Sequence, residues 1–231
     1  MKIMGVIGGV GPESTIDYYK AIIARFRQRM PEAGYPPVII NSVDLERLRA
    51  WMEAGQYPPV IEYLVQEISR LARAGADFAL LSANSPHIVF DEIRERSPIQ
   101  LISIVDATRN AAQQRGLTRL ALIGTRFTMQ GGFYTKSFEE AGMTLIVPSA
   151  QEQDFIHQKY FDELVLGKFL PQTRQQLCDI LRDMRRRDAI EAVILGGTEL
   201  PLILTGDNVD GMPLLDTTRI HVNAAIEHML A

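Results

Sequence analysis

Cysteine is almost absent from this chain, in which Cys178 is the only one among 231 residues. A single thiol excludes an internal disulfide and a thiolate metal cluster, and it is typical of a reducing compartment. Long apolar runs are also missing, since none approaches the roughly 18 residues that a membrane span needs. The apolar start at 3–9 is broken by glycines too early for a secretion signal. We therefore expect a cytoplasmic protein that does not enter a membrane.

The chain also lacks an excess of charge of either sign. Its 24 Lys and Arg stand against 28 Asp and Glu, which gives a formal net charge of −4. No global field therefore attracts nucleic acid or an anionic membrane, and neither is expected as a partner. The hydrophobic fraction of 46% is typical of a folded protein. The length suits one large domain or two small ones.

What the sequence does contain is a regular alternation of short apolar runs and longer amphipathic stretches. Runs rich in Ile, Val and Leu predict β-strands at 3–7, 38–43, 78–81, 101–104, 120–123, 144–147, 192–195 and 213–215. Amphipathic stretches between them, such as 58–74 before Gly75, predict helices. This pattern predicts an α/β protein with mainly parallel sheets flanked by helices.

An internal repeat relates the two halves of the chain. Gly8 and Tyr18 recur as Gly124 and Tyr134, each at an offset of 116 (124 − 8 and 134 − 18). Further along, the small-residue segment around position 83 lines up with that around position 197, at an offset of 114 (197 − 83). The repeat indicates two similar α/β units.

These offsets predict two pseudosymmetric domains. The first is expected to comprise residues 1–100 together with 213–231, whose final strand and helix would cross back to the first half. The second is expected to comprise residues 101–212. A site between such domains would receive matching loops from both of them.

Several loops follow a predicted strand and open a helix, where backbone N–H groups and the helix dipole favour an anion. The loop 8–15 lacks the third glycine of a dinucleotide fingerprint, and no Gly-Lys-Ser/Thr sequence supports a P-loop. Gly11 is therefore a candidate for carboxylate binding, with a tight glycine turn as the structural alternative. The loop 214–218 is interpreted as mainly structural.

The loop 82–87 is unusually rich in small and polar residues. Asn84 and the N–H groups around Ser85 are candidates to hold a carboxylate, with Ser85 expected as a helix N-cap before Pro86. His87 is a candidate acid or base, and its alternative is a partly buried, hydrogen-bonded histidine.

The loop 195–201 repeats this logic in the second half. Thr198 is a candidate cap or ligand, and Glu199 is either an acid–base group or a carboxylate that stabilises a helix start. Arg47 follows the strand at 38–43, where it would clamp a carboxylate or lie on the surface. The basic run 185–187 is interpreted as the solvated end of a helix.

With these loops in view, the sequence resembles the aspartate/glutamate racemase family, and more closely its broad-specificity amino-acid racemase branch. The resemblance covers nearly the whole chain and rests on GGVGPEST at 8–15, SVD at 42–44, NSPH at 84–87, ALIGTR at 121–126 and LGGTE at 195–199. It implies two pseudosymmetric α/β domains, an active site between them, no cofactor and a homodimer. We expect no metal. The expected ligand is a small amino acid or a dicarboxylate, and the candidate binding residues are Gly11, Arg47, Asn84, Ser85, Thr125 and Thr198.

The family moves an α-proton with two cysteines, and the resemblance places them at the positions of Ala83 and Gly197. Neither residue carries a proton, so two-thiol racemisation is not expected, and restoring both thiols is predicted to create it. The lysine that some members use for a substrate carboxylate is replaced here by Val165, which leaves Arg47 for that role.

Three hypotheses stay open on this scaffold. In the first, an α-proton step such as racemisation uses Glu199 and His87 as acid and base. In the second, a different isomerase or lyase acts on a carboxylate substrate. In the third, the protein binds a carboxylate without catalysis.

Overall fold

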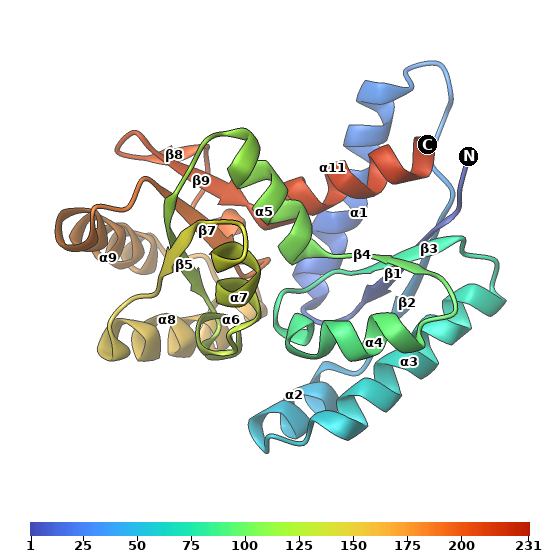
Figure 1. Cartoon of the computed structure of the whole chain (residues 1–231), viewed down its shortest axis with the longest axis horizontal. Coiled ribbons are helices and arrows are strands. Elements are labelled where there is room, and N and C mark those ends of the chain that lie inside the picture. The colour runs from blue at the N-terminus through green and yellow to red at the C-terminus, as the bar shows by residue number, and fades with distance from the viewer. The chain divides into compact units, whose positions relative to one another are not determined.

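The computed structural model describes all 231 residues and divides into two compact units (Figure 1). Unit 1 comprises Met1–Ile104 and His221–Ala231, and unit 2 comprises Val105–Ile220. The chain first forms β1 (Met4–Gly8), α1 (Pro12–Arg29), β2 (Val38–Ser42), α2 (Leu45–Glu53), α3 (Tyr57–Arg73), β3 (Phe78–Leu81), the 3-10 helix η1 (Ser85–Val89), α4 (Phe90–Arg96) and β4 (Gln100–Ile102).

The later elements repeat the same kind of alternation. They are α5 (Ile104–Gln114), β5 (Arg119–Gly124), α6 (Arg126–Gln130), α7 (Phe133–Glu139), β6 (Thr144–Ile146), α8 (Ala150–Asp162), η2 (Leu164–Leu166), α9 (Pro171–Asp188), β7 (Ala192–Gly196), α10 (Leu200–Ile203), β8 (Asn208–Val209), β9 (Met212–Asp216) and α11 (Thr217–Leu230). No helix combines the length and the apolar character that crossing a membrane requires.

The two sheets share the order of their four parallel strands, which explains the repeat in the sequence. The strand order is β2-β1-β3-β4 in one sheet and β6-β5-β7-β9-β8 in the other, and every pair is parallel except β8 with β9. Ile7 pairs with Leu81 in the first sheet, and Ile123 pairs with Leu195 in the second. The predicted α/β fold with two pseudosymmetric halves is therefore confirmed.

Strand β9 corrects the predicted domain boundary. It pairs with β7 and is the fourth parallel strand of the second sheet, as β4 is of the first. The strand predicted at 213–215 therefore belongs to unit 2, and only the chain from His221 onward belongs to unit 1. At the other boundary, residues 101–104 belong to unit 1, because β4 completes its sheet.

Both faces of the central strands β1 and β3 of the first sheet are buried. Met4 and Val6 of β1 point into a core shared with α1 and with Val222 and Ile226 of α11. A Cβ atom on Gly5, on the opposite face, would lie 3.0 Å from the Leu71 side chain of α3. This two-sided burial explains why the strands read as continuous apolar runs rather than alternating ones.

In unit 2, helices α8 and α9 cover one face of the sheet. Their residues Ile156, Tyr160 and Leu181 join strand residues such as Ala121 and Val193 in one hydrophobic core. Cys178 is buried in the same core, and burial raises the pKa of its thiol. The single cysteine is therefore a core residue of α9.

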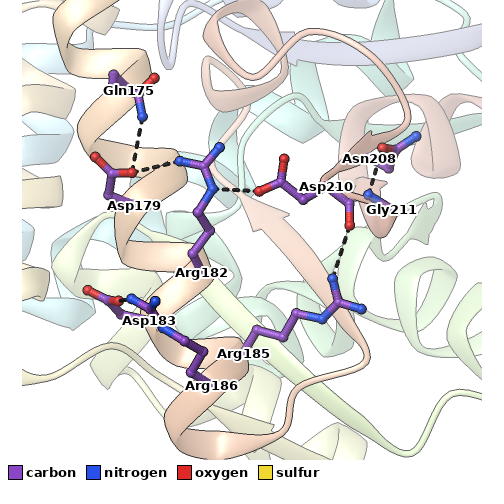
Figure 2. Close-up of polar contacts among 9 residues, drawn as sticks. All are labelled: Gln175, Asp179, Arg182, Asp183, Arg185, Arg186, Asn208, Asp210 and Gly211. Atoms are coloured by element: carbon purple, nitrogen blue, oxygen red, sulfur yellow. Dashed lines mark hydrogen bonds and ion pairs between the residues drawn. The ribbon is translucent and has the colours of Figure 1, made fainter.

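The arginine-rich end of α9 is held by specific contacts with the β8–β9 turn (Figure 2). Arg182 donates from Nε to the Asp210 carboxylate at 2.5 Å, and Arg185 donates to the Asp210 carbonyl at 3.0 Å. Asp210 has a positive φ of 50°, and Arg182 lowers the pKa of its carboxyl. These contacts attach the hairpin to α9, so the basic run is a paired surface feature.

Candidate functional site

In unit 1 the predicted site residues lie at the carboxyl edge of neighbouring strands. The loop after β1 carries Gly11 and the loop after β3 carries Ala83, and β1 and β3 pair directly. The Ser14 hydroxyl donates to the Gly11 carbonyl at 2.8 Å and lies 3.5 Å from the Ser82 carbonyl oxygen. The two predicted ligand-binding loops of this unit are thus adjacent.

The glycines of the first loop are required by backbone geometry. Gly11 is the N-cap of α1 and has a φ of 99°, a backbone conformation that is unfavourable for residues with a side chain. A side chain on Gly9 (φ 80°) would collide with the backbone of Val43, whose N–H donates to the Gly8 carbonyl at 2.9 Å. The tight-turn alternative therefore accounts for these glycines, and a ligand contact by Gly11 remains a prediction.

The loop after β3 is buried and differs in detail from its sequence-based prediction. Ala83 and Asn84 are 4% and 3% exposed. Asn84, rather than Ser85, is the N-cap, and Ser85 begins the 3-10 helix η1, with no side-chain capping bond. The small residues thus place a helix start directly at the edge of the sheet.

The surroundings of His87 are typical of a structural histidine rather than of an acid or base. It is 3% exposed, its ring stacks on Phe90 with centroids 4.6 Å apart, and its Nε2 accepts from the Ile104 N–H at 3.3 Å. Burial, followed by the proximity of His221, lowers its pKa to about 3. The ring is therefore neutral at physiological pH, which weighs against the predicted acid–base role.

A buried pair next to His87 was missed by the sequence analysis. His221 donates from Nε2 to the Ile102 carbonyl at 2.8 Å, which leaves Nδ1 to accept from the Tyr18 hydroxyl at 3.0 Å. Burial lowers the pKa of His221 to about 4. Tyr18 belonged to the internal repeat, but nothing in the sequence linked it to a residue 203 positions away.

Arg47 lies on the surface of α2 between two aromatic rings. Its guanidinium carbon is 4.6 Å from the centroid of Trp51 and 4.9 Å from that of Tyr63. Asp44 caps this helix by accepting from the Arg47 N–H at 3.2 Å. No acidic side chain pairs with the guanidinium, so its donors face solvent in an orientation that the rings restrict.

In unit 2 the predicted residues gather at the equivalent edge. Thr125 follows β5 and Gly197 follows β7, and Gly124 pairs with Gly196 at the ends of these strands. Thr125 is the N-cap of α6, and its hydroxyl accepts from the Thr128 N–H at 3.4 Å. Val165, by contrast, packs against the hydrophobic core of the unit.

The centre of this edge is a buried cluster around Glu199, which is 1% exposed. Oε2 of Glu199 accepts hydrogen bonds from the Tyr160 hydroxyl and, at 2.9 Å, from the Thr198 hydroxyl. Burial, followed by the charge of Glu199, raises the pKa of the Tyr160 phenol well above its ordinary value. The phenol therefore keeps its proton and donates it to the carboxylate.

Tyr160 also fills the space beside Gly197. A Cβ atom built on Gly197 would lie 2.5 Å from Cε2, 2.9 Å from the hydroxyl oxygen and 3.0 Å from Cζ of the tyrosine ring. Real Cβ atoms do not approach other atoms so closely, so Gly197 cannot carry a side chain while the ring stays there. Tyr160 comes from α8, 37 residues earlier (197 − 160), and no motif marks it.

Two α/β units with the same order of parallel strands, each with small-residue loops at the carboxyl edge of its central strands, define a two-domain α/β protein with an internal repeat. The chain belongs to the Asp/Glu/Hydantoin racemase family, whose model matches residues 7–225. No group of three or more His, Cys, Asp and Glu side chains is arranged to hold a metal ion.

Individual relatives agree with this assignment. An aspartate racemase homologue from Pyrococcus horikoshii OT3 is 32% identical with a TM-score of 0.86, and both chains are covered completely. A candidate Asp/Glu racemase from Yersinia pestis is 29% identical with a TM-score of 0.89, again over both whole chains. The broad specificity amino-acid racemase RacX of Bacillus subtilis (strain 168) is 22% identical over 167 residues, which are 71% of this chain and 67% of the relative.

Proposed function

We propose that this protein binds a small amino acid or dicarboxylate of the aspartate/glutamate class, with the loop 82–87 of unit 1 and the loop 196–199 of unit 2 serving one ligand. The named relatives are racemases of such amino acids or their homologues. The observation that carries the proposal is the repeated arrangement of buried, small-residue loops at both sheet edges. The backbone N–H groups and the dipole at a helix start suit a carboxylate.

We further propose that the protein does not use two-thiol racemisation. The positions at which the resemblance places the thiols hold Ala83 and Gly197, and the ring of Tyr160 occupies the side-chain space of Gly197. His87 is neutral and its Nε2 is already an acceptor, so it does not replace the first thiol. We also expect no cofactor, a cytoplasmic location and a homodimer, the last of which light scattering would test.

Calorimetric titration with L- and D-aspartate, L- and D-glutamate and succinate tests the ligand class. At least one of them is expected to bind. Two further measurements on the same samples separate racemisation, lyase activity and simple binding. One follows loss of the α-proton in deuterated water, and the other is chiral chromatography. Full D/L interconversion would mean that other groups replace both thiols, which contradicts the argument that nothing replaces the first one. Lyase products would favour the lyase alternative. No binding at about 10 mM, above the usual range of substrate constants, would reject the ligand class.

The exposed guanidinium of Arg47 gives a specific prediction. Arg47→Ala should weaken ligand binding about 10- to 100-fold, the loss expected when a charged hydrogen-bond pair is removed. Arg47→Lys should recover only part of it, because an ammonium does not form the bidentate contact. Calorimetry measures both.

Arg49→Ala is the matched control, because Arg49 lies on the same helix and pairs with Glu46 and Glu53. Its affinity for the ligand should equal that of the natural protein. An unchanged affinity in Arg47→Ala would instead place the ligand carboxylate elsewhere, and would leave the guanidinium as part of the surface stack on Trp51 and Tyr63.

A further inference from the structure

The hydroxyl-bearing edge of the Tyr160 ring lies against the point where a side chain at position 197 would begin. The hydroxyl oxygen is 2.9 Å from the site of a Cβ atom on Gly197, and the hydroxyl donates to the Glu199 carboxylate. A second contact runs from the Glu199 N–H to the same hydroxyl at 3.5 Å. A proton-bearing oxygen with a carboxylate partner therefore lies next to the position that the resemblance gives to the second thiol.

We propose that Tyr160 and Glu199 form a proton-transfer pair that exchanges the α-proton of a bound amino acid on one face only. The inference rests on the proposed function, because it requires an amino-acid ligand at this edge of unit 2. It adds Tyr160 as the group that touches the α-carbon, with Glu199 as its proton acceptor.

The step conserves atoms and charge. The Cα–H bond breaks and its proton forms a new bond to the Tyr160 oxygen, while the phenolic proton passes to Oε2 of Glu199. The electron pair of the broken bond stays on the α-carbon and is delocalised into the ligand carboxylate. The reverse sequence returns a proton to the same face. When the protons of the pair exchange with deuterated water, the ligand returns with deuterium at the α-carbon and its configuration retained.

The environment of the pair supports this chemistry. Tyr160 and Glu199 are 5% and 1% exposed, so bulk water does not compete for the hydrogen bond between them. Thr198 donates to the same carboxylate oxygen at 2.9 Å and thereby orients it. Because its pKa is raised, the phenol stays protonated and acts as a relay, and the group that finally takes up the proton is the Glu199 carboxylate. A carboxylate is a weak base toward a C–H bond, so the exchange is expected to be slow.

Exchange is expected on one face because neither Ala83 nor His87, the two residues considered for the second acid–base group, supplies one. Ala83 has no titratable atom, and the neutral ring of His87 is engaged with the Ile104 N–H. A proton removed by Tyr160 therefore returns from Tyr160. The signature of the pair is deuterium incorporation without inversion, which differs from both racemisation and simple binding.

Proton NMR of L- and D-aspartate and L- and D-glutamate in deuterated water, with chiral chromatography of the same samples, tests the proposal. The natural protein should deplete the α-proton signal of one enantiomer without forming the other. Tyr160→Phe keeps the ring and removes the hydroxyl, so it should slow this exchange by about 100-fold or more. Glu199→Gln should do the same, while calorimetry should show that both variants still bind the ligand.

Tyr134→Phe is the matched control, because Tyr134 is the other fully buried tyrosine of unit 2 and its hydroxyl contacts Thr108 instead. Its exchange rate should stay at the natural value. If Tyr160→Phe does not fold, the exchange rates of Glu199→Gln and of the natural protein test the proposal.

The possible failures are distinct. Ligand binding without α-proton exchange in the natural protein overturns the proton-transfer pair and leaves the proposed function intact. Exchange that is undiminished in Tyr160→Phe, or equally reduced in Tyr134→Phe, also overturns the pair. Absence of binding by every amino acid in the panel overturns both proposals.

Discussion

The variant Ala83→Cys/Gly197→Cys should not gain racemase activity while Tyr160 is present. The new Cβ atom at position 197 would overlap the phenol ring, so the loop or the ring must move. Such overpacking typically costs about 1–3 kcal/mol of stability. This corrects the expectation from sequence alone that restoring the two thiols is sufficient to create racemisation.

Adding Tyr160→Leu should change the outcome. Leucine lacks the ring atoms Cε2, Cζ and the hydroxyl oxygen that collide with a side chain at position 197, and it retains part of the apolar volume of the core. The triple variant should interconvert D- and L-aspartate or glutamate at least ~100-fold faster than the double variant, in line with a restored acid–base group. Chiral chromatography measures the rates, and thermal unfolding compares the stabilities.

Tyr160→Leu by itself is the control and should show no interconversion. Racemisation in the double variant would mean that the tyrosine ring moves aside readily, and the steric argument would then fail. A triple variant that folds and binds the ligand but remains inactive would mean that positions 83 and 197 do not serve one ligand. In that case the shared use of the two loops would be rejected.

The fold could be predicted well from the sequence because local patterns and an internal repeat both indicate it. Each apolar run near the predicted positions became a strand, and the offsets of 116 and 114 correspond to equivalent residues in two sheets of one topology. The domain boundary at residue 213 was wrong because strand pairing is a tertiary property. An apolar run of this length does not reveal whether its neighbour is β4 or β7.

The two units also exchange helices. Helix α5 follows the first sheet but belongs from Val105 onward to unit 2, and α11 follows the second sheet but belongs from His221 onward to unit 1. Tyr18 correspondingly meets His221 of α11, and its repeat partner Tyr134 meets Thr108 of α5. The exchange at the end of the chain thus has a counterpart in the middle. In both places the helix belongs mostly to the other unit, while the strand before it remains in its own sheet.

The place of the candidate loops at the sheet edges was predictable from sequence, but the contacts of their side chains were not. The loops around Ala83 and Gly197 were found because strand ends and helix starts have a signature in sequence. The protonation of His87 and the contact of Tyr160 with Glu199 depend on burial and on side chains from distant elements. Such contacts are absent from any local pattern, which is why the sequence pointed to His87 and passed over Tyr160.

The buried histidines lead to a large expected effect of acid on stability. His87 and His221 have folded-state pKa values of about 3 and about 4, against an ordinary value of 6.5. Below pH 6.5 the unfolded chain binds protons at both rings while the folded chain does not. Stability is therefore complete above that pH and falls as the pH decreases toward 4, by about 1.4 kcal/mol per histidine and pH unit.

Two such groups would remove about 5 kcal/mol between pH 6.5 and 4.5, a large part of the 5–15 kcal/mol by which domains are usually stable. Urea unfolding at a series of pH values measures this slope. His87→Gln and His221→Gln should each reduce it by about 1.4 kcal/mol per pH unit, whatever their effect at neutral pH. Half-buried His157 provides the control, and His157→Gln should leave most of the slope in place.

The result for His87 also bears on function. A slope that is unchanged in His87→Gln would mean that this ring gains a proton in the folded protein, as the unfolded chain does. His87 would then again be a candidate for the first acid–base group, and exchange on a single face would no longer be expected. A reduced slope would instead confirm that the ring stays neutral, because only a group with different proton uptake in the two states contributes to the pH dependence.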